Sequence, residues 1–391
     1  MATVLETSSA VTYREAQPVI NFEDAAHLAK TYGTPCLAYS RSALIRNYQT
    51  MRNCLPNVEF FYAAKANCNH LLLKVLAEQG CSVDVCSYRE MVAALEAGFS
   101  PNMMIHTHPC KTESNLSSCF AEGVRWFTFD NPNEIEKLRP YGDSINVLTR
   151  LSMASRSSVI NLSAKFGINV RDAAGLMCQA RDAGLNVRGM SFHVGSQCTE
   201  PEDFMQALMQ ARRVWNEATD AGIPLEVLDF GGGFPAPYRE KVLTLESYCN
   251  SLAQSLDLSF GDIIPSIRVI AEPGRGMCAD TVTLVTKVIG KSVRNGMPWY
   301  FIDDGLYGSF SGKVFDHTDF PLFAEGQNDR ELFPCVVAGP TCDSTDIVAK
   351  DQLLPELEIG DLLIVPSMGA YTAASASGFN GLDIAQAVPV D

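Results

Sequence analysis

One lysine follows directly on an apolar run in the stretch FFYAAKAN, Phe60 to Asn67. Side chains of a strand alternate between its two faces, so Phe61, Ala63 and Lys65 would share one face. A lysine that ends a buried strand is costly unless it is paired, chemically modified or open to water. We interpret Lys65 as the covalent anchor of an aldehyde cofactor; the alternative is an ordinary lysine that reaches solvent along its apolar stem.

Two glycine-rich segments follow later apolar runs and could hold a phosphate group. In DFGGGFP, the backbone N–H groups of Gly231, Gly232 and Gly233 can approach a phosphate closely, although a tight turn is the alternative. In AEPGRG, Gly274 permits close approach of the backbone and Arg275 offers positive charge. Together the two segments predict an anion site.

A carboxylate and a histidine end two further runs. Glu272 ends the run RVIAE, and a buried carboxylate needs a partner. A pyridinium nitrogen is a suitable partner, because the carboxylate would keep such a ring protonated; a salt bridge to Arg275 or Arg150 is the alternative. His193 in SFHVGSQ is either a site residue or a core residue. A lone histidine in a strand is more often a core residue.

Three histidines at the ends of runs also raise the question of a metal site: His106, His108 and His193. The spacing HTH would put two imidazoles on one face of a strand. No carboxylate joins them at an obvious ligand spacing. We therefore expect no metal.

The elements that would position these residues follow a regular rhythm from residue 58 onward. Eight β-rich runs alternate with helical segments: VEFFYAAK, SVDVCS, MMIHTH, WFTFD, INVLTRLS, VRGMSFHV, LEVLDFGGG and RVIAEPG. This rhythm predicts a (β/α)8 TIM barrel over residues 35–270, with an open doubly wound sheet as the alternative. In a barrel, Lys65, Asp84, Arg150, His193 and Glu272 would all meet at the carboxyl ends of the strands, where barrel enzymes carry their active sites.

The chain changes character after Gly274. Strand-like runs such as TVTLVTKVIG, PWYFIDD, PCVVAG and DLLIVP come without long helices between them. We expect a second, mostly β domain made of residues 271–391 with residues 1–34. Within it, GPTCDSTD combines Cys342 and Asp343 in a loop; an Asx turn is the alternative interpretation.

Composition narrows the class of protein. The chain has 391 residues, 47% of them hydrophobic, and a formal net charge of −15. An acidic surface disfavours nucleic acid and anionic membranes as partners. The 13 cysteines form no CxxC pair, which favours a reducing compartment over a disulfide framework. No run approaches the length of a membrane span, so we expect a cytoplasmic protein.

Taken together, these residues resemble the pyridoxal-phosphate decarboxylases with the alanine-racemase fold, specifically the ornithine/lysine decarboxylase family. The motifs that carry the resemblance include YAAKAN, DVCS, SFHVGSQ, LDFGGGFP, AEPGRG, DDGLYGSF with FDH, GPTCD, and GAYT followed by FNG. They occur in the family's order between about residues 35 and 381. Chance agreement of so many motifs in order is implausible.

The resemblance implies roles for individual residues. Lys65 would hold pyridoxal 5'-phosphate covalently, His193 would stack on its ring, and Glu272 would pair with the ring nitrogen. The other residues implied to bind the cofactor are Asp84, Arg150, Ser196, Gly231, Gly232, Gly233, Gly274, Arg275 and Tyr371.

The resemblance also implies a head-to-tail homodimer with shared active sites, in which the GPTCD loop comes from the neighbouring subunit. Cys342 would return a proton to the substrate carbon, while Asp316, Asp343 and Tyr307 would face the substrate. The implied reaction is decarboxylation of L-ornithine or L-lysine to putrescine or cadaverine, with release of carbon dioxide.

One departure from the family bears on the substrate. Relatives usually have Tyr-Ala-Asn-Pro where this chain has His106-Thr107-His108-Pro109. This difference favours, as an alternative, a related, acylated or carrier-linked amino acid as substrate. Racemisation and a non-catalytic regulatory homologue are further alternatives; retention of Lys65 and Cys342 speaks against the regulatory one.

Overall fold

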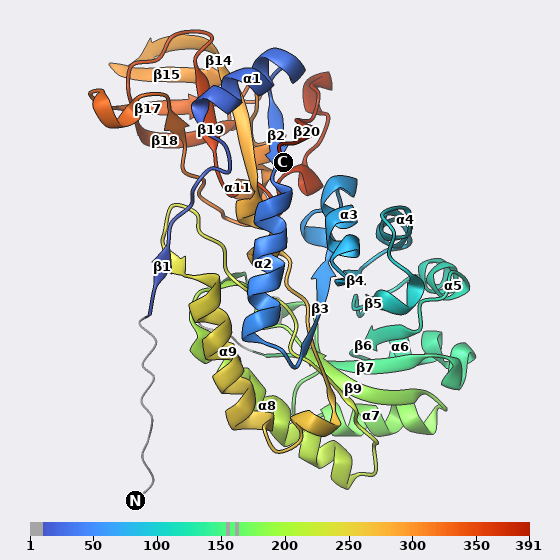
Figure 1. The fold of residues 1–391 in the computed structure, drawn as a ribbon. Helices are drawn as coiled ribbons and strands as arrows, with labels where there is room; N and C mark the ends of the chain where they lie inside the picture. Colours follow the sequence, from blue (N-terminus) through green and yellow to red (C-terminus); the bar gives the residue numbers. More distant parts are fainter. Residues whose placement is uncertain (1–10, 154–156, 161–163) are drawn as a thin grey trace, which may run out of the picture.

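The computed structural model describes residues 11–153, 157–160 and 164–391, and its larger lobe is a closed parallel barrel (Figure 1). The eight predicted runs are its eight strands, joined around the ring in the order β11-β13-β3-β4-β5-β6-β7-β9. The barrel is therefore confirmed, and the open sheet is wrong. The strands are β3 (Val58–Ala63), β4 (Ser82–Val85), β5 (Met104–His106), β6 (Trp126–Phe129), β7 (Asn146–Leu151), β9 (Asn186–Phe192), β11 (Val227–Asp229) and β13 (Arg268–Ala271).

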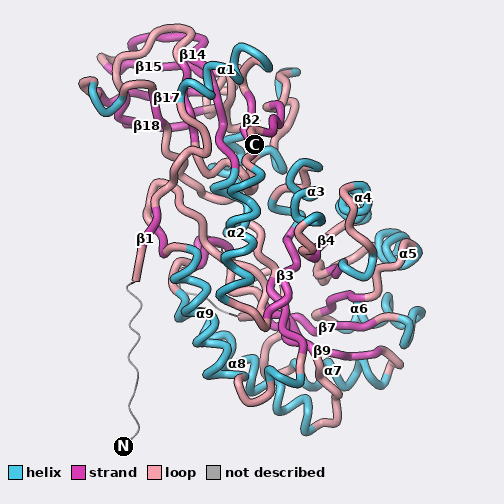
Figure 2. The backbone as a smooth tube through the Cα atoms, in the orientation of Figure 1, coloured by secondary structure: helices cyan, strands magenta, loops and turns pink. Residues whose placement is uncertain are grey.

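Helices alternate with these strands along the chain and surround the barrel (Figure 2). Local signals set their ends: Asn69 Oδ1 accepts a hydrogen bond from the Leu71 backbone N at 2.9 Å, which caps α3. Among the residues that the structure describes, no helix has the length and apolar character needed to cross a membrane. The helices are α2 (Arg41–Cys54), α3 (His70–Glu78), α4 (Tyr88–Glu96), α5 (Glu113–Ala121), α6 (Pro132–Leu138), α7 (Ala173–Asp182), α8 (Pro201–Asp220), α9 (Leu245–Phe260) and the short α10 (Arg275–Cys278).

The smaller lobe is built on a mixed sheet in the order β16-β19-β14-β15-β17-β18, with β2 and β20 attached through β14. Its longest strand, β14, pairs with β19 along one part of its length and with β15 along the other. Apart from the helix α1 (Phe22–Tyr32) and the short helix α11 (Gly312–Phe315), the lobe has the β character predicted for it. The strands are β2 (Cys36–Tyr39), β14 (Val282–Arg294), β15 (Met297–Ile302), β16 (Phe323–Ala324), β17 (Phe333–Ala338), β18 (Ile347–Leu354), β19 (Leu362–Val365) and β20 (Gln386–Pro389).

The domain boundary differs from the prediction at residue 35. Strand β2 pairs with β14 and β20, so it belongs to the smaller lobe, and the barrel begins with α2. The buried residues of α1 (Phe22–Tyr32) pack in the same cluster as β2, as expected for the N-terminal segment. By contrast, β1 (Tyr13–Arg14) pairs with β12 (Val242–Leu243) on the barrel side. Sequence patterns show strands but do not show which sheet a strand joins.

The two lobes meet at the carboxyl ends of the barrel strands. Asn67, just beyond β3, donates its side-chain N–H to the carbonyl oxygen of Gly369 at 2.9 Å. The backbone N of Tyr371 donates to the carbonyl oxygen of Ala66 at 2.9 Å. Of the predicted site residues in the smaller lobe, Tyr371 lies near Lys65 and Asp316 pairs with Arg275 at this junction.

Candidate active site

Lys65 lies in a short turn (Ala64–Ala66) directly after β3, next to the end of β4. Its Nζ atom is 2.8 Å from Oδ2 of Asp84, whose side chain is fully buried, while the Lys65 side chain is 33% exposed. Burial lowers the pKa of Lys65, but the Asp84 carboxylate and other nearby groups outweigh burial and hold that pKa well above its ordinary value. Lys65 is therefore an ammonium group at the mouth of the barrel, held by one carboxylate.

Glu272 follows β13 and lies beside a second buried carboxyl group, that of Asp229 at the end of β11. Each buried carboxyl group disfavours ionisation of the other. Burial, and then the neighbouring carboxyl groups, raise the pKa of Glu272 well above its ordinary value; burial raises the pKa of Asp229 to about 6. Among the described residues, neither Oε1 of Glu272 nor Oδ2 of Asp229 has a hydrogen-bond partner. A cationic N–H donor placed here would let Glu272 ionise.

Arg275 forms the centre of a separate, positively charged cluster. Its Nη1 donates to the Tyr238 hydroxyl at 2.6 Å, and its Nη2 donates to Ser196 Oγ at 3.1 Å. Its guanidinium lies 4.8 Å from the ring centre of Tyr371. The anion that pairs with it is Asp316, from the smaller lobe. A buried arginine surrounded by hydroxyl groups is suited to bind a phosphate.

The glycine run passes close to the backbone of Phe192, at the end of β9, and of Glu272. Gly231 has φ +71°, and a Cβ atom there would collide with the carbonyl oxygen of Phe192. A Cβ atom on Gly232 would lie 2.6 Å from the Glu272 carbonyl oxygen and 3.0 Å from Nε2 of His193. Glycine is therefore required for the backbone to pass this close to the site.

His193, at the end of β9, is a neutral imidazole. Its Nδ1 accepts a hydrogen bond from the Gly195 backbone N at 2.9 Å. Burial, and then the positive charges of Arg150 and Lys65, lower the pKa of His193 well below its ordinary value. Arg150 itself ends β7 with its guanidinium 5.3 Å from the ring centre of Phe166. A neutral, partly buried imidazole is able to stack on a flat ring.

The residues expected to face the substrate gather in a different place. The Tyr307 hydroxyl donates to Asp343 Oδ2 at 2.5 Å, and the Tyr307 ring stacks on Phe379 with 4.2 Å between ring centres. Cys342 is exposed, and its backbone N donates to Asn380 Oδ1 at 3.0 Å. Within the described part of the chain, no hydrogen bond or ion pair connects these residues to Lys65. Asp316, by contrast, lies in the site, because its carboxylate pairs with Arg275.

Comparison with known proteins places this arrangement in a family. The profile described as "Pyridoxal-dependent decarboxylase, pyridoxal binding domain" matches residues 41–279. The chain is 40% identical to the lysine/ornithine decarboxylase of Selenomonas ruminantium over 362 residues, covering 92% of this chain and 91% of that protein. This chain belongs to the pyridoxal-dependent decarboxylases.

Solved structures agree with this assignment over almost the whole decarboxylase. An SrLDC mutant in complex with PLP has a TM-score of 0.91 and 38% identity, covering 96% of each chain. The lysine/ornithine decarboxylase of Vibrio vulnificus complexed with cadaverine has a TM-score of 0.89 and 36% identity, covering 95% of this chain and 98% of that chain. The protein is thus a pyridoxal-phosphate-dependent enzyme.

The site of the decarboxylase fits this cofactor. The Asp229–Glu272 pair lacks a cationic partner, and a protonated ring nitrogen would supply one. The Arg275 cluster and the glycine run suit the phosphate, and Lys65 carries the amine that bonds an aldehyde carbon.

Three residues with contacts in the site were missed by the sequence interpretation: Asp229, Tyr238 and Thr107. Asp229 directly precedes the glycine run, and its position at a strand end was a usable signal. Thr107 lies in the segment that departs from the family pattern, and its hydroxyl bonds Asp84. Tyr238 lies in a loop with no distinguishing pattern.

The two histidines of that segment do not form a metal cluster. Among the described residues, no group of three His, Cys, Asp or Glu side chains is placed to hold a metal ion. His106 is buried against Phe127, with 5.8 Å between ring centres, and His108 meets the ring of Phe166 edge-on at 5.4 Å.

Proposed function

We propose that this decarboxylase removes the α-carboxylate of L-ornithine or L-lysine and forms putrescine or cadaverine. The observation that carries the proposal is the set of three complementary positions at one end of the barrel: the Lys65 amine, the Glu272 carboxyl group and the Arg275 cation. The names of the relatives from Selenomonas and Vibrio support a basic amino acid as substrate.

Each residue has a task in this reaction. Lys65 would hold the cofactor through its side-chain amine, which lies at the mouth of the barrel. Glu272 binds the ring nitrogen and keeps it protonated, His193 lies on the ring face, and Arg275 with Ser196 binds the phosphate. The bound pyridoxal phosphate supplies an electron sink for the electron pair that remains when carbon dioxide leaves.

The final proton comes from Cys342 in this proposal, and Cys342 acts in the site of a second copy of the chain. The exposure of Cys342 supports this assignment. Asp343 and Tyr307, which lie beside Cys342, would enter the neighbouring site with it. Asp343 and Asp316 provide negative charge for the distal ammonium group of the substrate.

We place the enzyme in a reducing compartment, and the cytoplasm is our proposal. Within the described residues, the structure shows no disulfide bond among the cysteines. Such usage is common where glutathione keeps thiols reduced.

A substrate panel tests the proposal. Cofactor-loaded enzyme is incubated with ornithine, lysine, arginine and side-chain-acylated diamino acids, and carbon dioxide and amine products are quantified. We expect the highest kcat/KM with ornithine or lysine. Higher kcat/KM with an acylated substrate would assign the enzyme to modified amino acids, and no carbon dioxide from any substrate would refute decarboxylation.

A further inference from the structure

Asp84 uses both carboxylate oxygens, and only one of them contacts Lys65. Oδ2 lies 2.8 Å from Lys65 Nζ. Oδ1 accepts a hydrogen bond from the Thr107 hydroxyl at 2.5 Å and lies 3.4 Å from the Thr107 backbone N. The Asp84 side chain is fully buried, and Thr107 is 4% exposed. Water therefore does not replace the hydroxyl as a donor to this carboxylate.

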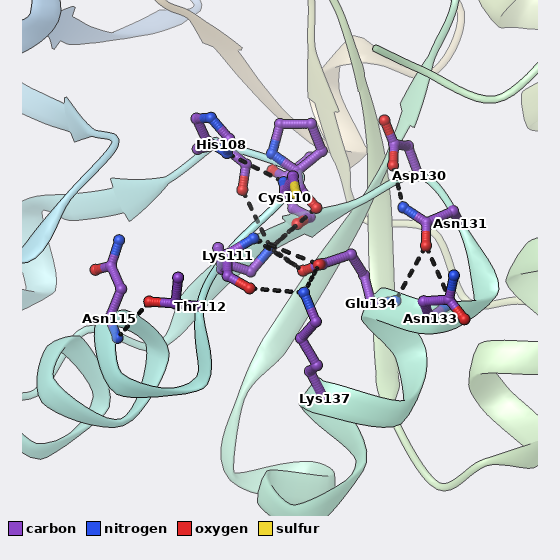
Figure 3. A network of polar contacts seen from close by, with 12 residues as sticks. His108, Cys110, Lys111, Thr112, Asn115, Asp130, Asn131, Asn133, Glu134 and Lys137 are labelled. Carbon is purple, nitrogen blue, oxygen red and sulfur yellow. Dashed lines mark hydrogen bonds and ion pairs between the residues drawn. The ribbon is translucent and has the colours of Figure 1, made fainter. Parts of the chain in front are cut away.

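The loop that carries Thr107 is fixed by a buried network around Lys111 (Figure 3). Lys111 Nζ donates to the carbonyl oxygen of His108 at 3.1 Å and to that of Thr128, in β6, at 2.6 Å. It also lies 3.1 Å from Oε2 of Glu134 in α6, and both side chains are almost fully buried. Lys137 pairs with the other oxygen of Glu134. Residues 107–111 are thereby held between β5 and β6.

The neighbouring histidines do not replace the hydroxyl. Burial lowers the pKa of His106 to about 3, and burial together with the Lys111 charge lowers the pKa of His108. Both rings are therefore neutral at physiological pH. Besides Asp84, the titratable groups that face Lys65 are Cys86 and Glu90 near the end of β4, His193 after β9, Glu272 after β13, and Tyr371 from the smaller lobe.

We propose that Thr107 is a positioning residue whose hydroxyl holds the Asp84 carboxylate in the orientation that pairs with Lys65. A hydrogen bond to an ionised group is among the stronger ones, and its loss in a buried site weakens the ionised form.

The test measures the protonation of Lys65 in the full-length chain freed of cofactor. Wild type, Thr107→Val and Thr107→Ser are labelled briefly with acetic anhydride across a range of pH, and mass spectrometry gives the labelling rate of the peptide that contains Lys65. Only the neutral amine reacts. We expect Thr107→Val to lower the pKa of Lys65, so that at a fixed pH below that pKa Lys65 is labelled about tenfold faster. Thr107→Ser should match wild type.

Controls separate positioning from a general structural effect. The exposed Lys350 should be labelled at the same rate in all three proteins. Thr107→Ala, which also lacks the hydroxyl, replaces Thr107→Val if the valine variant does not fold. Equal Lys65 labelling in wild type and the variant without the hydroxyl would overturn the proposal. Because no decarboxylation is measured, this result is independent of the proposed function.

Discussion

The contact between Arg275 and Asp316 leads to a prediction in which one substitution strengthens cofactor binding. The two side chains are 5% and 11% exposed, so their charges are poorly screened by solvent. A phosphate that binds Arg275 through Nη2 would displace the Asp316 carboxylate. Asp316→Asn keeps the shape of the side chain and removes the competing charge.

The expected size follows from the energy of one charge-assisted contact. A hydrogen bond to a charged group contributes about 1.5–3 kcal/mol, and about 1.4 kcal/mol corresponds to a tenfold change in affinity. Asparagine retains an oxygen that Arg275 can bind, so we expect an energy at the lower end of this range. The Kd of the cofactor-free enzyme for pyridoxal phosphate should fall about tenfold.

The assay is an equilibrium titration of cofactor-free enzyme, followed by the visible absorbance of the bound cofactor. Pyridoxal without phosphate is the ligand control, because its affinity should not change. Asp319→Asn is the matched variant: it removes the same charge from the same segment, but its side chain is 50% exposed and pairs with Lys313 and Arg239. We expect no change in its Kd.

A second measurement on Asp316→Asn distinguishes the prediction from a general loosening of the site. If Asp316 also faces the distal ammonium of the substrate, KM for ornithine or lysine should rise while the Kd for pyridoxal phosphate falls. A Kd for pyridoxal phosphate that is unchanged or higher, or an equal change for pyridoxal, would refute the reasoning.

Further predictions concern single residues. Lys65→Ala should abolish the absorbance of bound cofactor and the release of carbon dioxide; retention of both in the purified variant would remove Lys65 from its role. Cys342→Ala should keep the absorbance but misdirect proton return, which product analysis detects as a reduced yield of amine, and a normal yield would contradict the assignment. In cofactor-free enzyme, Asp229 keeps its proton up to about pH 6, whereas its ordinary pKa is 3.8. The free energy of unfolding should therefore fall by up to about 3 kcal/mol as pH rises from about 4 to about 7, and urea unfolding of Asp229→Asn should lack this part of the decrease. Lys111→Met leaves a buried carboxylate with one cation fewer and should cost about 3 kcal/mol of stability, more than Lys137→Met, because Lys137 is 28% exposed; equal urea midpoints would refute this order.

The sequence by itself determined the elements and the end of the barrel that carries the chemistry. Apolar runs bounded by caps and glycines are local signals, so all eight barrel strands were found where the runs predicted them. Parallel strands expose their carboxyl ends on one side, and this placed Lys65, Asp84 and Glu272 together before any contact was known. The second domain was recognised by the same local signals.

The tertiary structure decided which groups touch. The sheet that β2 joins depends on pairing with strands far along the chain, and no local pattern encodes that choice. The same is true of the Asp229–Glu272 pair and of Asp316 on Arg275, because register and packing between distant segments bring these charges together. In the sequence, Lys65 is a lysine at the end of an apolar run. The structure adds that its carboxylate partner is held by Thr107, a contact set by where the loop after β5 packs.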